Sequence, residues 1–181
     1  MAAGPYVDPH PPASVVERIK ERFPDDVLEA AAFRGELTIV VPKERIAAIA
    51  LFLRDDPQSA FGMLIDLTGV HFLERDYDFE VVYHLYSLEK NHRLRLKVRL
   101  REKETVPSVT PVWPGANWQE REAFDLVGVR FAGHPDLRRI IMPEDYTQHP
   151  LRKDFDVEGG PTALDAPGGP ASPGFRDMER I

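Results

Sequence analysis

The chain has 181 residues, of which 43% are hydrophobic and 29% are charged, and its formal net charge is −7. These values are ordinary for a single soluble globular domain, and the negative charge argues against nucleic acid as the main partner. The chain has no cysteine, which excludes disulfides, thiol nucleophiles and thiolate-bound iron–sulfur clusters, so any redox centre must lie on another chain.

The first part of the chain predicts two helices and three strands. Residues 1–12 contain four prolines and are expected to be a flexible lead without a signal-peptide pattern. Apolar residues at helical spacing within 15–23 indicate a helix that Pro24 ends. Pro42 suits the first position of a second helix, because its missing N–H costs nothing there. Strands are expected at residues 27–33, 37–41 and 63–72, the last interrupted near Gly69.

The clearest pattern is a β-hairpin formed by residues 79–88 and 93–101 around a polar turn. In its second strand, apolar residues alternate with arginine and lysine, which gives one apolar and one basic face. A symmetric turn predicts that Val81 lies opposite Leu100. The basic face is either a solvated sheet face with cross-strand pairs or a surface for an acidic protein partner or phosphate.

The order of elements predicts an α+β fold with a mixed, largely antiparallel sheet and helices packed mainly on one face. From Asp156 onward the chain is rich in glycine, proline and alanine, so this tail alone is expected to be disordered. We divide the chain into a flexible lead (1–12), an α+β domain (13–141) and an extended C-terminal segment (142–181). We expect this segment to wrap on a partner subunit.

A third helix is predicted at residues 118–127, with Asn117 and Glu120 capping its start and Gly128 at its C-terminal end. A helical wheel places four side chains on one arc: Trp118, Arg121, Glu122 and Asp125. That arc either supplies general acids and bases or forms an ion-pair network. The network is favoured, because an arginine beside two carboxylates keeps both of them ionised.

Two histidines each precede a proline, which holds them on extended or turn segments. The two segments are similar: His134-Pro135-Asp136-Leu137-Arg138-Arg139 and His149-Pro150-Leu151-Arg152-Lys153-Asp154. One hypothesis is a stand-alone metal-dependent hydrolase whose ligands are His134, Asp136, His149 and Asp154. The spacing matches no metal motif, so the favoured interpretation is that Asp136 caps a short turn while the arginines bind a neighbour.

A longer pattern surrounds these residues. It consists of Glu120-Arg121-Glu122, Phe124-Asp125-Leu126, Gly128, Phe131 and Gly133-His134-Pro135-Asp136-Leu137-Arg138-Arg139-Ile140. This pattern resembles the signature of one subunit family of proton-translocating NADH:quinone oxidoreductase, respiratory complex I. The family is lettered C in bacteria, and its mitochondrial counterpart is the thirty-kilodalton subunit. The likeness covers roughly residues 14–156, including 107–110, 113–118 and 149–155. His71 stands where the family usually has aspartate, and Gln148 where glycine is common.

The resemblance implies a non-catalytic structural subunit of the peripheral arm, in a complex that couples electron transfer from NADH to quinone with proton translocation. It implies docking on the large subunit that forms the quinone cavity, lettered D, and on adjacent iron–sulfur subunits. FMN and the clusters would belong to those partners, with no cofactor on this chain. An equivalent subunit of an energy-converting hydrogenase, or of a ferredoxin- or F420-linked complex, stays open as the alternative.

The expected location is the cytoplasmic face of the bacterial plasma membrane, held there through partner subunits. The longest strictly apolar run is residues 46–53, far below the roughly 20 residues that span a bilayer. The resemblance also implies a set of interface residues, among which Arg138 and Arg139 are expected to bind carboxylates of a neighbour. The set is Glu120, Arg121, Glu122, Asp125, Gly128, Gly133, His134, Pro135, Asp136, Leu137, Arg138, Arg139, His149, Pro150, Arg152, Lys153 and Asp154.

Overall fold

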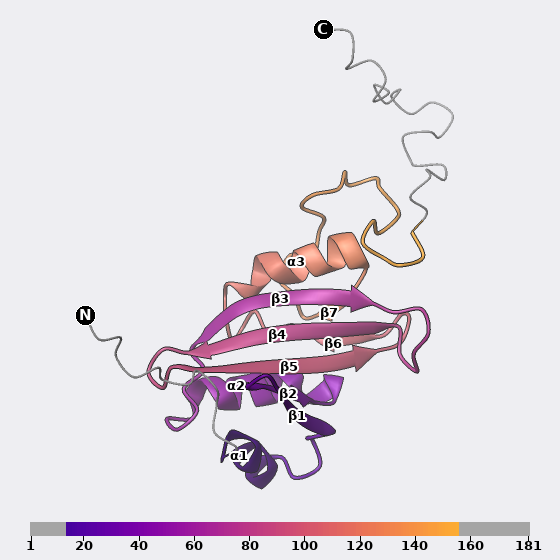
Figure 1. The fold of residues 1–181 in the computed structure, drawn as a ribbon. Coiled ribbons are helices and arrows are strands. Elements are labelled where there is room, and N and C mark those ends of the chain that lie inside the picture. The colour runs from indigo at the N-terminus through magenta and orange to yellow at the C-terminus, as the bar shows by residue number, and fades with distance from the viewer. Residues whose placement is uncertain (1–13, 156–181) are drawn as a thin grey trace, which may run out of the picture.

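The computed structural model describes residues 14–155, and the predicted lead and the tail beyond residue 155 lie outside this part of the chain. Five strands form the main sheet and two short strands form a second one (Figure 1). In chain order the elements are α1 (Ser14–Arg22), β1 (Glu29–Phe33), β2 (Glu36–Val40), η1 (Lys43–Arg45), α2 (Ile46–Asp55), β3 (Met63–His71), β4 (Phe79–Ser87), β5 (His92–Leu100), β6 (Thr105–Pro107), α3 (Ala116–Val127) and β7 (Arg130–Ala132). Within residues 14–155, no helix is long and apolar enough to cross a membrane.

The main sheet is mixed and largely antiparallel, as predicted, with the strand order β1-β2-β5-β4-β3. β2 and β5 run parallel, whereas β1–β2, β4–β5 and β3–β4 are antiparallel. β1 and β2 form the predicted hairpin around Arg34 and Gly35, whose positive φ angles suit a two-residue hairpin turn. The parallel pair of β6 and β7 was not predicted. Its strands are too short to produce a periodic pattern.

The β4–β5 hairpin is present, but its predicted register is wrong by two residues. Val81 pairs with Val98 rather than with Leu100. The turn consists of residues 88–91, because Asn91 takes a left-handed φ of 54°, which asparagine tolerates better than most residues. A shift of two residues keeps every side chain on its predicted face, so the apolar and basic faces are confirmed.

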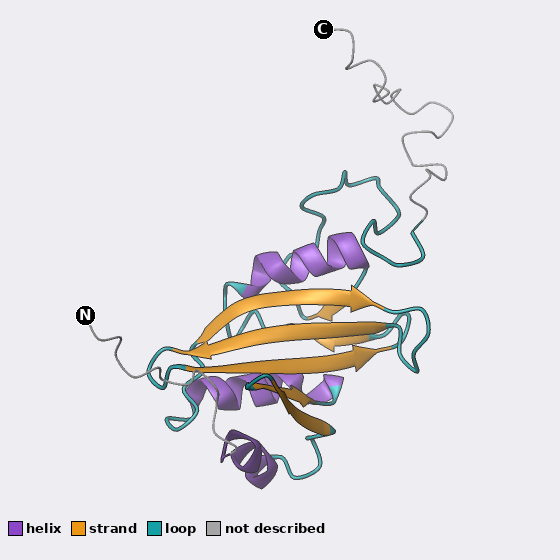
Figure 2. Cartoon of the chain, in the orientation of Figure 1, coloured by secondary structure: helices purple, strands orange, loops and turns teal. Residues whose placement is uncertain are grey.

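The apolar face of the sheet forms the core together with the helices. Tyr83 and Leu96 pair across β4 and β5, and both are fully buried. The buried residues of α1, α2 and α3 belong to the same cluster as this face. Figure 2 shows α3 beside β3 and the other two helices toward β5 and β2. The predicted α+β class is therefore confirmed.

The opposite face of the sheet carries cross-strand ion pairs. They join Arg95 to Glu36, Lys97 to Glu80 at 2.6 Å and Arg99 to Glu29 at 2.5 Å. Each of these basic side chains of β5 thus meets a carboxylate on a neighbouring strand, which supports the solvated-face interpretation. Exposed pairs of this kind contribute only about 0–1 kcal/mol each.

β3 is irregular at a different place from the one predicted. Its register with β4 shifts between Leu64 and Asp66, whereas Gly69 pairs regularly with Val81. A Cβ at Gly69 would lie 3.2 Å from Val129 Cγ2, just beyond the end of α3. The glycine therefore allows this end of the helix to approach the sheet closely and does not interrupt the strand.

Candidate functional site at the third helix

α3 ends as predicted but begins differently. Gly115 holds the N-cap position without a side-chain hydrogen bond, and Asn117 lies inside the helix, so the predicted cap is wrong. Carbonyls of the preceding loop accept the first amide hydrogens, which removes the need for a capping side chain. At the other end, Gly128 adopts a left-handed φ of 91° and donates to the carbonyls of Ala123 and Phe124.

Glu120, the second predicted cap, is fully buried instead. Its carboxylate accepts hydrogen bonds from the amide of Val109 and from Ser108 Oγ, both at 2.7 Å, and lies 3.3 Å from Thr110 Oγ1. Burial raises the pKa of Glu120, and the hydroxyl and amide donors only partly oppose this rise. Glu120 thus holds the loop before α3, because it lies on the helix side that faces the core.

Asp125 is also fully buried, and it binds a loop that returns to the helix. Its Oδ2 accepts the amide hydrogens of Ile140, Ile141 and Met142 at 3.0, 2.7 and 2.9 Å. Its Oδ1 accepts a hydrogen bond from Arg139 at 2.6 Å. Burial alone would raise the pKa of Asp125, but these donors outweigh it and hold the pKa below its ordinary value.

Two arginines bind carbonyl oxygens of the same loop. Arg121 donates to the carbonyls of Arg138 and Arg139 at 3.1 and 3.2 Å, and its guanidinium lies 4.7 Å from the centre of the Trp118 ring. Arg139 also donates to the carbonyl of Gln148 at 3.1 Å. The arc is therefore a bonded network, as favoured from the sequence, although Arg121 binds backbone carbonyls rather than carboxylates. Arg139, expected to reach a neighbour, has its carboxylate partner within the chain.

The two pre-proline histidines lie at opposite ends of α3. His134 Nε2 is 3.2 Å from the carbonyl oxygen of Asn117, and its Nδ1 accepts the amide hydrogen of Asp136. His149 Nδ1 is 2.9 Å from the carbonyl oxygen of Asp125, near the end of the helix. Residues 14–155 contain no group of three or more His, Asp and Glu residues placed to hold a metal ion. The proposed four-residue metal set is therefore not brought together.

The other predicted residues divide between packed and exposed positions. Gly133 turns the chain with a φ of 78°, and Leu137 packs against the core. The side chain of Arg138 is 63% exposed and pairs with Asp136 at 2.9 Å, the local partner that the sequence offered. The exposed members of the set are Glu122, Pro135, Asp136, Arg138, Lys153 and Asp154, while Pro150 is half-buried.

Residues 142–155 contain no helix or strand, and they are held against this chain by backbone hydrogen bonds. The amide of Leu151 donates to the carbonyl of Leu126 at 2.9 Å. The amide of Lys153 donates to Nδ1 of the buried His71, also at 2.9 Å. A ring nitrogen of His71 thus fills an acceptor role that a carboxylate oxygen would also fill. Whether the segment further wraps on a partner stays a prediction.

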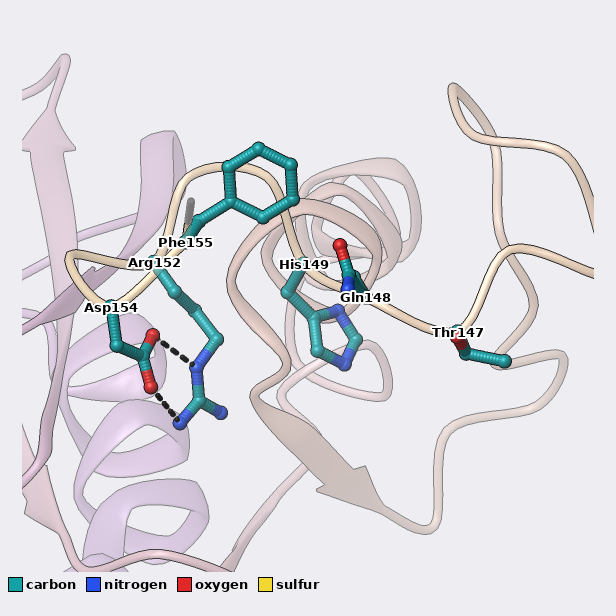
Figure 3. A pocket seen from close by; sticks show the side chains of 6 residues that line it. All are labelled: Thr147, Gln148, His149, Arg152, Asp154 and Phe155. Carbon is teal, nitrogen blue, oxygen red and sulfur yellow. Dashed lines mark hydrogen bonds and ion pairs between the residues drawn. The ribbon is translucent and has the colours of Figure 1, made fainter. Parts of the chain in front are cut away.

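An open pocket of about 350 Å³ lies beside this segment (Figure 3). It is lined by Thr147, Gln148, His149, Arg152, Asp154 and Phe155. Arg152 points toward Asp154, with hydrogen bonds of 3.0 and 3.3 Å, and also binds Glu102 at 2.9 Å. The bonds to Glu102 and Asp154 raise the pKa of Arg152. Its charge is therefore matched within the chain, which favours a structural role over the binding of an anion.

Sequence reasoning missed the residues that receive these buried charges. Ser108 and Thr110 were noted only as part of a stretch that resembles the family, and the loop amides carry no side-chain signal at all. The available clue was the position of Glu120 among the apolar residues of the helical wheel. A carboxylate on a buried face requires several donors, and the preceding loop was the place to look for them.

Comparisons with known proteins bear on this arrangement. The sequence profile described as "Respiratory-chain NADH dehydrogenase, 30 Kd subunit" matches residues 39–161. Among the relatives are NADH-quinone oxidoreductase subunits lettered C. The one from Roseiflexus sp. is 52% identical over 146 residues, which cover 80% of this chain and 84% of that protein. The one from Hyphomonas neptunium is 47% identical over 147 residues, covering 81% and 73%.

A third relative of the same name, from Caulobacter vibrioides, is 55% identical over 141 residues, covering 78% of this chain and 71% of that protein. The matched stretch of the profile contains α3, the loop bound by Asp125 and the segment that ends at residue 155. The chain belongs to the family of the 30-kDa subunit of respiratory-chain NADH dehydrogenase, which is lettered C in the NADH-quinone oxidoreductases of these bacteria.

Proposed function

We propose that this chain is a structural subunit of the peripheral arm that docks on the large quinone-site subunit, lettered D, and on adjacent iron–sulfur subunits. It carries no catalytic residue and no cofactor in this role, and FMN and the iron–sulfur clusters belong to partner subunits. It is held at the cytoplasmic face of the bacterial plasma membrane through those partners. The absence of cysteine supports this division of roles, because thiolates usually hold the clusters.

The observation that carries the proposal is a set of exposed apolar side chains around α3. Trp118 is 64% exposed, Ile141 60% and Leu151 58%. Large side chains of this kind, tryptophan above all, are typical of the centres of protein–protein interfaces. Together with the exposed Arg138 they form what we call the α3 surface.

The internal network fixes the α3 surface in place. Arg121 stacks on Trp118 and binds the carbonyl of Arg138, while the amide of Ile141 is bound by Asp125. A surface whose backbone is already held loses little conformational entropy when a partner binds. The buried charges of the signature thus support the docking side chains around them.

Site-specific photo-crosslinking tests the identity of the partner. A photoreactive phenylalanine derivative at Trp118 is expected to crosslink to the large quinone-site subunit in the purified complex. The matched control is Leu88 in the β4–β5 turn, which is 73% exposed but lies outside the α3 surface. Crosslinks from position 118 to other subunits only would overturn docking on the large subunit. The same preparation identifies the complex, because NADH-binding subunits and a nickel-ligating subunit distinguish it from a related hydrogenase.

Arg138→Ala tests the contribution of the exposed cation. Its only recorded partner is Asp136, and both side chains are more than half exposed, at 63% and 53%. We expect the yield of assembled complex to fall more than the Tm of the isolated chain, because exposed pairs contribute only about 0–1 kcal/mol to folding. An unchanged yield together with a lowered Tm would contradict this role.

A further inference from the structure

The two edges of the main sheet are treated differently. At one edge, α3 lies along β3 (Figure 1), and Gln119 Nε2 donates to the carbonyl oxygen of Ile65 at 3.2 Å within the irregular part of the strand. At the other edge, no strand within residues 14–155 pairs with the outer side of β1. All five residues of β1 are exposed.

β1 also lacks the sequence features that usually protect an edge strand. Proteins blunt such edges with lysine, proline, a bulge or a covering element. The sequence of β1 is Glu29-Ala30-Ala31-Ala32-Phe33, and its pairing with β2 is regular throughout. Leu28, just before the strand, is 56% exposed, and Phe33, at its end, is 71% exposed. A regular, unprotected edge with apolar ends is suited to accept a further strand.

The register with β2 identifies the backbone groups available on this edge. The two-residue turn makes Phe33 and Glu36 a hydrogen-bonded pair, so Ala31 also directs its amide and carbonyl toward β2. Ala30 and Ala32 alternate with them, and their amides and carbonyls point outward. These groups match the pattern that only an extended polypeptide satisfies.

We propose that β1 accepts an extended segment of another subunit of the complex, which adds to the sheet as a sixth strand beside β1. The segment would carry large apolar side chains at alternate positions, because the alanines of β1 leave room beside Leu37, which is only partly buried. Membership of the complex supports the existence of such partners. The added strand does not depend on which subunit receives the α3 surface.

A second copy of this chain is a poorer occupant. Two β1 strands paired with each other would place mainly alanine against alanine. Specific, stable interfaces bury roughly 1,200–2,000 Å² in total, and short alanine-rich strands supply far less. A partner with larger side chains buries more apolar surface against the same backbone, which favours a different subunit over self-association.

A matched pair of variants tests the edge in the assembled complex. Ala32→Pro removes an outward amide but no hydrogen bond to β2, a position at which an edge strand tolerates proline. Ala32→Thr keeps that amide and serves as the control. We expect Ala32→Pro to lower the recovery of assembled complex several-fold relative to Ala32→Thr. Equal recovery of complex with both variants would overturn the proposal.

Amide hydrogen exchange of the unmodified protein gives a test that does not depend on a variant. A peptide covering residues 28–34 is compared between the isolated full-length chain and the purified complex. We expect the amides of Ala30 and Ala32 to exchange rapidly in the isolated chain and slowly in the complex. Rapid exchange in both states would overturn the proposal. Slow exchange in the isolated chain would also overturn it, by assigning the edge to this chain or to a second copy.

Discussion

The β4–β5 hairpin and the region around α3 both contain many charged residues, but they use them in opposite ways. In the hairpin, Arg95, Lys97 and Arg99 pair with carboxylates on the solvent face, above an apolar core. Around α3, Glu120 and Asp125 are fully buried and bind backbone amides. The same types of side chain are thus peripheral in one region and structural in the other.

The difference follows from where each region satisfies its backbone. Strands β4 and β5 hydrogen-bond each other over nine residue pairs, so their amides need no side-chain partner. Residues 138–155 contain no helix or strand, and several of their amides therefore rely on buried acceptors. Buried carboxylates replace a neighbouring strand in this part of the molecule, which makes their removal costly.

The largest effect is expected for Asp125→Ala. This change leaves three amides and the guanidinium of Arg139 without their acceptor, in a pair whose side chains are only 0% and 10% exposed. Removing one partner of a buried ion pair typically costs about 3–5 kcal/mol. Urea unfolding of the isolated chain measures this loss. A loss below about 1 kcal/mol, the level of an exposed pair, would erase the contrast between the two regions.

Gly128→Ala is expected to have the next largest effect. A Cβ at this position would lie 2.8 Å from the ring of His149, and the residue has a left-handed φ of 91°. The left-handed conformation alone costs an alanine roughly 1–2 kcal/mol, and the contact displaces His149 from Asp125. Thermal unfolding should show a lower Tm.

Gly115→Ala is the matched control for this prediction. Gly115 adjoins the other end of α3, has a φ of −62° and has no atom within 4 Å of its would-be Cβ. Alanine at such a position is expected to stabilise by about 0.4–1 kcal/mol, by restricting the unfolded chain. If both alanine variants lowered the Tm equally, close packing by His149 would not be the cause at Gly128.

Much of the sheet could be predicted from the sequence, because alternation along β5 reports directly which face is buried. The register could not, since it depends on Asn91 adopting a left-handed conformation that its neighbours do not dictate. The boundaries of α3 were nearly right, but the roles of Glu120 and Asp125 were not found. Their partners are mostly backbone amides of distant loops, which have no signature in residue type. Family resemblance located this region without explaining its bonds.

Opposite pH dependences of Asp125 and Glu120 are the third prediction. The folded-state pKa of Asp125 is lowered, so its contribution to stability is present above its unfolded pKa of about 4 and is lost as pH falls through the folded value. The folded-state pKa of Glu120 is raised, so stability is lost as pH rises from its unfolded pKa through the folded value. The free energy of unfolding from about pH 3 to 7 measures both contributions.

Amide variants separate the two carboxylates in that experiment. Asp125→Asn should remove part of the stability lost on acidification, and Glu120→Gln should remove part of the loss as pH rises. Each variant keeps the size of the side chain and changes only its titration. Changes of the same sign in the two profiles would show that burial dominates at both positions and that the loop amides do not set the pKa of Asp125.

The smallest effect is expected for Arg95→Ala on the solvent face of the sheet. Arg95 pairs with Glu36 and donates to Thr38 Oγ1 at 3.2 Å, but Glu36 is 47% exposed. A double-mutant cycle with Glu36→Ala should give a coupling of about 0–1 kcal/mol that weakens as salt is added. A coupling as large as the roughly 3–5 kcal/mol expected of a buried pair would mean that β5 depends on its charges as α3 does. The contrast between the two regions would then reflect only how readily each pattern is seen in the sequence.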